Sequence, residues 1–244
     1  MKGPMARVEH APRARARSIV GALARVYPDA RLELDFHTPL ELLVALILAA
    51  QFRDERVNQI TPALFARFRT ARDYAEAKTA ELESYLREVN FNRKKTKAVQ
   101  ACARALVENF GGEVPRELDQ LLTLPWVGRK TANILLGNAF GEPAIGVDRH
   151  VMRVSQRIGL TREHDPDRIE SDLVAVVPRA DQVRFCHLLQ LHGRRVCLAR
   201  APRCDACVIR RWCDFGKQTA APAKVATRRS AAQERGRRTV SSPR

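Results

Sequence analysis

One lysine of this chain, Lys130, lies where covalent chemistry is possible. It follows a short turn from Leu124 to Gly128 and falls in the first turn of a predicted helix. Pro125 ends the preceding helix, because proline lacks an N–H and restricts the residue before it. The positive end of a helix and partial burial both disfavour an ammonium group, and so favour the neutral amine. A neutral lysine amine can form a Schiff base with an aldehyde-like carbon.

Asp148 is the carboxylate best placed to act with this lysine. It lies beyond the loop that follows the helix of Lys130, and a carboxylate there can assist the amine or stabilise positive charge. The alternative interpretation is a surface lysine after a turn and a capping aspartate before a helix. The turn alone does not separate the two interpretations, because short motifs often mislead.

The turn before Lys130 also suits a phosphate group. The first N–H groups of a helix have no partner within the helix and attract anions. We expect Gly128 to take a backbone conformation closed to other residues and to allow close approach. The segment from Trp126 to Arg129 is therefore a candidate phosphate-contacting turn.

Four of the six cysteines lie close together near the end of the chain, with the spacing C-x6-C-x2-C-x5-C. They are Cys197, Cys204, Cys207 and Cys213. Four thiolates so close in sequence are typical of metal ligands rather than disulfides. Iron–sulfur clusters and zinc both accept four cysteines, so the spacing leaves both open. Arg200 and Arg203, between the first two ligands, are candidate phosphate contacts.

The net charge indicates the class of partner. The chain has 43 Lys and Arg residues against 27 Asp and Glu residues, which gives +16. Such a charge favours polyanions, with nucleic acid first and an acidic membrane surface second. No apolar run approaches the ~20 residues that cross a bilayer, and we find no apolar signal-peptide core. We therefore expect a cytoplasmic, nucleoid-associated protein without a membrane partner.

The hydrophobic pattern predicts an all-α protein, because helical periodicity dominates and alternating segments are few. A buried central helix is predicted after Thr38, the expected N-cap, and it ends in a polar loop at Gln51. A second loop, 91–95, carries Phe91 beside three cations, which suits a strand backbone and one inserted side chain. Residues 1–15 are predicted to be a flexible basic segment and 217–244 a disordered basic tail.

Together, the turn with its lysine, the segment from Val147 to His150 and the cysteine spacing resemble the endonuclease III family of helix-hairpin-helix DNA glycosylases. The resemblance covers roughly residues 16–216. It implies two helical domains with a DNA cleft between them. One is a six-helix domain, 32–142, with the helix-hairpin-helix at about 116–139. The other joins 16–31 to 143–216 and holds a [4Fe–4S] cluster on the four cysteines.

The resemblance also implies an activity. The protein would be a bifunctional glycosylase and abasic-site lyase of base excision repair, a monomer acting on duplex DNA with damaged bases or abasic sites. Lys130 would attack C1′ of an oxidised pyrimidine nucleotide and form a Schiff base, assisted by Asp148. Gln51 matches the residue that fills the vacated space in the duplex, and Phe91 falls where a second wedge would sit. The implied DNA-binding residues are Gln51, Phe91, Trp126, Val127, Gly128, Arg129, Arg200 and Arg203.

The sequence departs from the family pattern at the hairpin, where Trp126 replaces the first glycine of Leu-Pro-Gly-Val-Gly. Phe52 and Arg53 also stand where small or polar residues are usual. Two alternatives follow. One is a monofunctional glycosylase with another base preference, although such relatives generally lack a lysine at this position. The other is a cluster-stabilised DNA-binding paralogue with weak or altered activity. Trp126 is the feature that favours this second alternative.

Overall fold

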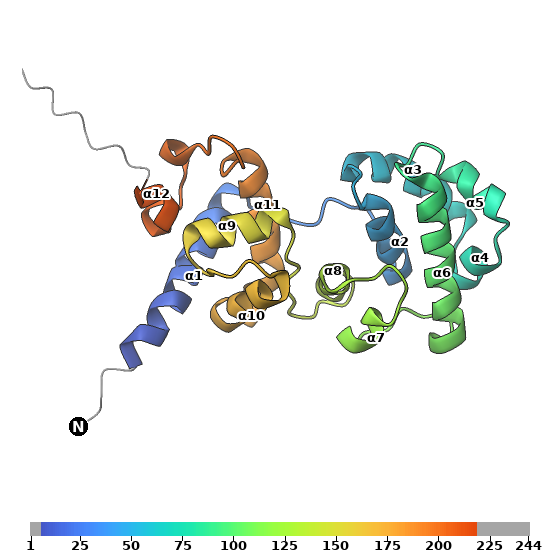
Figure 1. The fold of residues 1–244 in the computed structure, drawn as a ribbon, viewed down its shortest axis with the longest axis horizontal. Helices are drawn as coiled ribbons and strands as arrows, with labels where there is room; N and C mark the ends of the chain where they lie inside the picture. The colour runs from blue at the N-terminus through green and yellow to red at the C-terminus, as the bar shows by residue number, and fades with distance from the viewer. Residues whose placement is uncertain (1–5, 219–244) are drawn as a thin grey trace, which may run out of the picture.

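The computed structural model describes residues 6–218, and within them every regular element is a helix. Two lobes lie side by side, with α8 between them (Figure 1). One lobe holds α2 (Pro39–Ala49), α3 (Asp54–Arg67), α4 (Ala71–Glu76), α5 (Thr79–Tyr85), α6 (Asn92–Phe110), α7 (Leu118–Leu122) and α8 (Arg129–Ala139). The other holds α1 (Ala6–Val26), α9 (Arg149–Ile158), α10 (Pro166–Val176), α11 (Gln182–Arg195) and α12 (Asp214–Gln218). The predicted all-α fold is confirmed.

Each lobe has its own hydrophobic core. The buried residues of the first core run from Leu34 to Ala144. Those of the second come from the first helix, up to Tyr27, and from Ile145 onward. The chain therefore leaves one core and enters the next between Ala144 and Ile145. The limits 32–142 for one domain, and 16–31 with 143–216 for the other, stay predictions, and this division of the core supports them.

Helix α2 is the central helix of the first lobe. Thr38 is its N-cap, and the Thr38 hydroxyl accepts a hydrogen bond from the Glu41 N–H at 3.2 Å, as predicted. Its side chains Leu42, Leu43 and Leu48 are almost completely buried, which suits a helix that is apolar nearly all round. The helix ends at Ala49, and the next residues form the turn that carries Gln51.

The short helix α7, a turn and α8 form the predicted hairpin. Ala132 and Leu135 of α8 are buried in the first core. On another side of α8, the Asn133 amide donates to Glu170 of α10 at 2.7 Å and to the Ile145 carbonyl at 3.1 Å. Because α8 is anchored to both lobes, its N-terminus has a defined position between them.

The predicted flexible segment 1–15 is wrong from Ala6 onward, because α1 begins there. Alanine and arginine favour helix, and the arginines find acceptors on distant segments. Arg13 donates to the Ala175 carbonyl at 3.0 Å, and Arg15 to the Trp212 carbonyl at 2.8 Å. These contacts extend α1 along the second lobe. Residues 1–5 of this segment lie outside the described range.

The predicted loop 91–95 is also wrong beyond its first residue, because α6 begins at Asn92. Lys95 consequently lies one turn into a helix and is buried. At the other end, Lys217 belongs to α12, and the remainder of the predicted tail, 219–244, lies outside the described range. Among the described helices, none combines the length and the apolar character needed to span a bilayer.

Candidate active site and DNA-binding surface

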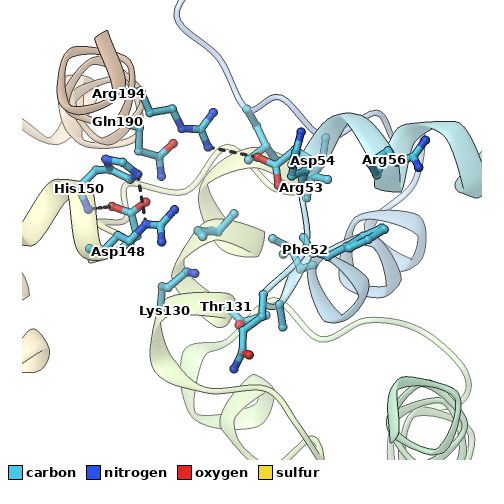
Figure 2. A pocket seen from close by; sticks show the side chains of 18 of the residues that line it. Phe52, Arg53, Asp54, Arg56, Lys130, Thr131, Asp148, His150, Gln190 and Arg194 are labelled. Carbon is cyan, nitrogen blue, oxygen red and sulfur yellow. Dashed lines mark hydrogen bonds and ion pairs between the residues drawn. The ribbon is translucent and has the colours of Figure 1, made fainter. Parts of the chain in front are cut away.

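A cleft of ≈ 1200 Å³ runs between the two lobes and is lined from both sides. The first lobe supplies Gln51 and Lys130, and the second supplies Asp148. Figure 2 shows Lys130 on α8 and Asp148 at the start of α9 on the same side of this cleft. The structure therefore brings together three residues that are far apart in the sequence.

Lys130 lies in the first turn of α8, as predicted. Its side chain is exposed at the cleft, so the expected partial burial is wrong. Within residues 6–218 no carboxylate or hydrogen-bond acceptor contacts its ammonium group.

Asp148 is the N-cap of α9. Its Oδ1 atom accepts the N–H groups of His150 at 2.8 Å and Val151 at 2.7 Å. The capping interpretation of Asp148 is therefore correct. It does not exclude a chemical role, because Oδ2 has no hydrogen-bond partner among the described residues and Asp148 lines the cleft. The cap thus holds one oxygen and leaves the other available.

The hairpin before Lys130 has the geometry of a type II turn. The Val127 N–H donates to the Leu124 carbonyl at 3.2 Å, with Pro125 and Trp126 between them. Proline is common at the second position of this turn, and a positive φ at the third usually requires glycine. Here Trp126 has a φ of 67°, and its side chain is 65% exposed. The residue with the unusual backbone is therefore Trp126.

Gly128 has an ordinary φ of −93°, so the expected restricted conformation is wrong. A Cβ atom at this position would meet nothing within 4 Å, which leaves the backbone open on that side. The first helical acceptor of α8 is the Gly128 carbonyl, bonded to the Ala132 N–H at 3.0 Å. The N–H groups of residues 129–131 precede this bond and suit a phosphate oxygen.

Two predicted DNA contacts of the hairpin have other partners. Val127 is buried, and its N–H already bonds within the turn. The Arg129 guanidinium makes a two-bond ion pair with Glu170 of α10, at 2.8 and 2.9 Å. Both oxygens of the Glu170 carboxylate are engaged, so the Arg129 side chain ties α8 to the second lobe. The groups of the hairpin that can bind an anion are therefore mainly backbone N–H groups.

Gln51 and Phe91 occupy two neighbouring loop tips of the first lobe. Both have positive φ angles, 56° and 59°, although neither is glycine. Gln51 is exposed at the cleft, and Phe91 is 59% exposed at the start of α6. Bulky residues take such angles only where the surrounding structure enforces them, and such positions cluster at functional sites.

The comparisons with known proteins agree with this architecture. Residues 44–179 match the model of the HhH-GPD superfamily of base excision DNA repair proteins. Endonuclease III of Synechocystis sp. is 48% identical over 200 residues, which cover 82% of this chain and 91% of that protein. Endonuclease III of Bacillus subtilis is 40% identical over 194 residues, 79% of this chain and 89% of that protein.

A solved structure is similar over the same range. The trapped endonuclease III–DNA covalent intermediate superposes with a TM-score of 0.78 at 38% identity, and covers 84% of this chain and 97% of that one. The chain belongs to the endonuclease III family. It is accordingly a base excision repair DNA glycosylase and lyase.

The four cysteines of this chain line one small cavity of the second lobe, beside His192 and Ile209. Cys204 and Cys213 adjoin two short 3-10 helices, Cys204–Ala206 and Arg210–Trp212. Burial raises the pKa of Cys207 to about 11 and raises that of Cys213, so a bound cation is needed to hold these thiols as thiolates. Among residues 6–218 no three potential ligands converge as they would on one metal ion.

Arginines of α9 hold the segment that carries the first cysteine. Arg153 donates to the carbonyls of Gly193 at 2.9 Å and Cys197 at 3.1 Å. Arg157 donates to the Leu198 carbonyl at 2.7 Å and to the Cys197 sulfur at 3.3 Å. Both arginines lie on the helix that Asp148 caps. Arg200 and Arg203 of the same segment are exposed, and no side-chain partner of either is found in the described part of the chain.

Sequence reasoning missed several charged groups of the cleft. Arg194 of α11 pairs with Glu33 and, at 3.3 Å, with Asp54 of α3 (Figure 2). Burial raises the pKa of Asp54, and the Arg194 guanidinium opposes that rise. Burial likewise lowers the pKa of His150. These residues come from four segments of the chain. Only Asp54, shortly after Gln51, and His150, in the segment from Val147 to His150, gave a signal in the sequence.

Proposed function

We propose that this endonuclease III removes oxidised pyrimidines from duplex DNA and then nicks the strand through a Schiff base on Lys130. The observation that carries the proposal is the shared cleft of Lys130 and Asp148, each at the N-terminus of a helix from a different lobe. The unpaired Lys130 amine is accessible to a nucleotide, which must leave the base stack to be reached.

The proposed reaction uses the DNA, the two side chains and water. The neutral Lys130 amine forms a bond to C1′ while the bond between C1′ and the base breaks, and the base leaves with that electron pair and takes up the proton that the amine gives up. The ring oxygen then leaves C1′ with its bonding electron pair and takes up a proton from water as the iminium forms. Loss of a proton from C2′ then expels the 3′ phosphate, which nicks the strand, and water releases Lys130.

Asp148 is proposed to stabilise the positive charge that develops on the sugar. Its Oδ1 atom is held by two backbone N–H groups, and its Oδ2 atom is left for this task. A carboxylate fixed in this way needs no reorganisation as the charge develops, which is the main source of electrostatic stabilisation in enzymes.

The DNA contacts are proposed to fall into two groups. Gln51 and Phe91 enter the duplex near the flipped nucleotide, because they occupy the two exposed tips beside the cleft. The backbone of Gly128 and Arg129, the Trp126 ring and the arginines Arg200 and Arg203 contact the flanking phosphates and sugars. The Val127 side chain supports the turn from within. We propose that one monomer suffices, since a single chain supplies Gln51, Lys130 and Asp148 to the cleft, and that the protein works at the nucleoid.

A [4Fe–4S] cluster is proposed to bind Cys197, Cys204, Cys207 and Cys213. The almost wholly apolar cavity that the four cysteines share supports this. When bound, the cluster supplies a cross-link that holds a segment with little core of its own. Arg200 and Arg203 would be positioned by it.

The test is reductive trapping with borohydride on two duplexes, one with a single thymine glycol and one with a single abasic site. We expect a covalent protein–DNA adduct on both and none with Lys130→Ala, which should still bind each duplex. Lys78→Ala is the matched control, because Lys78 is also an exposed lysine at a helix N-terminus but does not line the cleft.

Each result decides between interpretations of the site. Nicking or trapping that survives Lys130→Ala would remove Lys130 from its role. Base release from thymine glycol without an adduct would mean a monofunctional glycosylase. An adduct on the abasic duplex alone would overturn the oxidised-pyrimidine substrate and leave the lyase. Binding to both duplexes without chemistry on either would make the protein a DNA-binding paralogue.

A further inference from the structure

Lys95 is a buried cation that the proposed reaction does not use. Only 6% of the residue is exposed, and within residues 6–218 no carboxylate pairs with its ammonium group. Burying a charge without a counter-ion is costly, and burial lowers the pKa of Lys95 to about 8. A buried lysine therefore needs specific contacts that stabilise its ammonium group.

The side chain of Lys95 reaches the end of α2. Its Nζ atom donates to the Leu48 carbonyl at 2.7 Å and lies 5.4 Å from the centre of the Phe52 ring. The Leu48 carbonyl is one of the last in α2, so it accepts no hydrogen bond from an N–H of the same helix. A cation at this end also interacts favourably with the helix dipole. Lys95 therefore binds the helix end immediately before Gln51 and the aromatic ring immediately after it.

The main chain of Lys95 holds the other tip. Its N–H donates to the Phe91 carbonyl at 3.0 Å, and this bond opens α6 while Phe91 is in the left-handed conformation. One residue thus contacts both turns. Its side chain meets Leu48 and Phe52, on either side of Gln51, and its backbone bonds to Phe91. The Asn90 amide adds a direct bond to the Gln51 carbonyl at 3.3 Å.

The turn of Gln51 needs such support. Ala50 has φ −58° and ψ 113°, Gln51 has φ 56°, and the Phe52 N–H bonds to the Ala49 carbonyl at 3.0 Å. These values are typical of a type II turn, whose third position usually holds glycine. A glutamine in this position, like Phe91 in its own, adopts an unfavourable conformation that persists only when neighbours enforce it.

We infer that Lys95, aided by Asn90, is a positioning residue that holds Gln51 and Phe91 together as one rigid unit for entry into the duplex. The inference rests on the proposed function, in which these two tips contact DNA. Lys95 itself does not touch the DNA, and acts through the backbone of the two turns.

The test is a double-mutant cycle of Lys95→Met and Gln51→Ala, measured as single-turnover base excision on the thymine glycol duplex. Methionine keeps the straight chain and removes the donor. We expect Lys95→Met to slow excision about tenfold or more in the native background, as misplaced groups commonly do. In the Gln51→Ala background it should slow excision less than about twofold. Lys97→Met is the matched control, because Lys97 is an exposed lysine of the same helix.

Several outcomes would overturn the inference. An equal loss from Lys95→Met in both backgrounds would mean that Lys95 stabilises the fold without positioning Gln51. No loss in the native background would remove its role altogether. If Gln51→Ala and Phe91→Ala each leave excision unchanged, the proposed DNA contacts of these two residues are wrong. That result overturns part of the proposed function and is distinguishable from a failure of the inference about Lys95.

A second variant covers the case in which Lys95→Met does not fold. Asn90→Ala removes the bond to the Gln51 carbonyl at an exposed position, where the fold does not depend on the side chain. We expect it to slow excision several-fold and to lose that effect in the Gln51→Ala background. An Asn90→Ala effect that is the same in both backgrounds would contradict the coupling of the two tips.

Discussion

Asp148 combines a structural and a chemical role in one carboxylate, and the two can be separated by substitution. Asp148→Asn keeps an oxygen that can accept the N–H groups of His150 and Val151, because asparagine caps helices as well as aspartate does. We expect unchanged unfolding free energy and catalysis slowed by about 10²-fold, the usual effect of losing one electrostatic group. Chemical denaturation and single-turnover excision measure the two quantities.

Asp148→Ala is the matched comparison for this prediction, since it removes the cap as well as the charge. It should lose catalysis to a similar extent and also destabilise the protein by ~1 kcal/mol. An Asn variant that excises at the native rate would reduce Asp148 to a helix cap.

Trp126 adopts a positive φ that is energetically unfavourable for a residue with a Cβ atom. The left-handed region is unfavourable for residues with a Cβ atom by roughly 1–2 kcal/mol, and glycine avoids that cost but loses more entropy on folding. We expect Trp126→Gly to be more stable than Trp126→Ala by about 1 kcal/mol. Both variants lose the same exposed ring, so their difference isolates the effect of the φ of 67°.

Thermal or chemical unfolding of the two Trp126 variants checks this prediction. Equal stability, or a more stable alanine variant, would mean that the turn relaxes to a negative φ once the tryptophan is gone. DNA affinity of the same pair would then report the contribution of the ring alone.

At the scale of elements, the buried lysine of α6 makes the stability of the protein depend on pH in a definite direction. The pKa of Lys95 is about 8 in the folded protein and near 10.5 in the unfolded chain. Between these values the unfolded chain binds the proton that the folded protein has released, so stability rises with pH. Below about pH 8 the cost of burying the charge is fully present.

Lys95→Met lacks this titration and is the reference for measuring it. We expect the native protein to gain unfolding free energy relative to Lys95→Met as the pH rises from about 8 to 10.5. Denaturant unfolding of both proteins across this range gives the difference. A constant difference would show that Lys95 keeps an ordinary pKa in the folded protein.

Helix starts explain both the success and the failure of prediction from the sequence. The start of α2 was predictable, because Thr38, Pro39 and Glu41 each act locally in the cap. The start of α6 was not, because Phe91 offers no capping side chain and takes a left-handed conformation. The start of α1 depends on the docking of Arg13 and Arg15 onto segments more than a hundred residues away.

The candidate site divides in the same way. Lys130 and Asp148 each follow a local signal, a turn and a helix cap, and the cysteine spacing is likewise local. Burial of Lys95 was hidden, because a run of cations normally lies in solvent. The engagement of Arg129 by Glu170 was hidden too, since a long-range ion pair leaves no mark in the sequence around either residue.

At the scale of the whole molecule, ion pairs join the two lobes. Arg129 binds Glu170, and Arg194 binds Glu33 and Asp54. These arginines are engaged with carboxylates, so they contribute less to the attraction of DNA than the net charge of +16 suggests. Exposed cations without a carboxylate partner among the described residues include Arg53 and Arg56 at the cleft and Arg200 and Arg203 near the cysteines, and the basic C-terminal sequence adds others.

The C-terminal sequence therefore should contribute to affinity without contributing to chemistry. We predict that replacing its basic residues by serine makes the logarithm of the DNA binding constant fall less steeply with the logarithm of salt concentration. The slope should become shallower by about 0.9 for each phosphate that the variant no longer neutralises, because every neutralised phosphate releases bound counterions. The residues are Lys224, Arg228, Arg229, Arg235, Arg237, Arg238 and Arg244.

Excision under single-turnover conditions at saturating protein should stay at the native rate in this variant, since the cleft and both catalytic candidates lie within residues 6–218. Fluorescence anisotropy of an undamaged duplex at several salt concentrations measures the slope, and serine replacement keeps the chain length constant. An unchanged slope would mean that the phosphates are bound by the folded lobes alone. In that case the exposed cations of the two lobes, such as Arg53, Arg200 and Arg203, and the backbone around Gly128 would supply the electrostatic attraction.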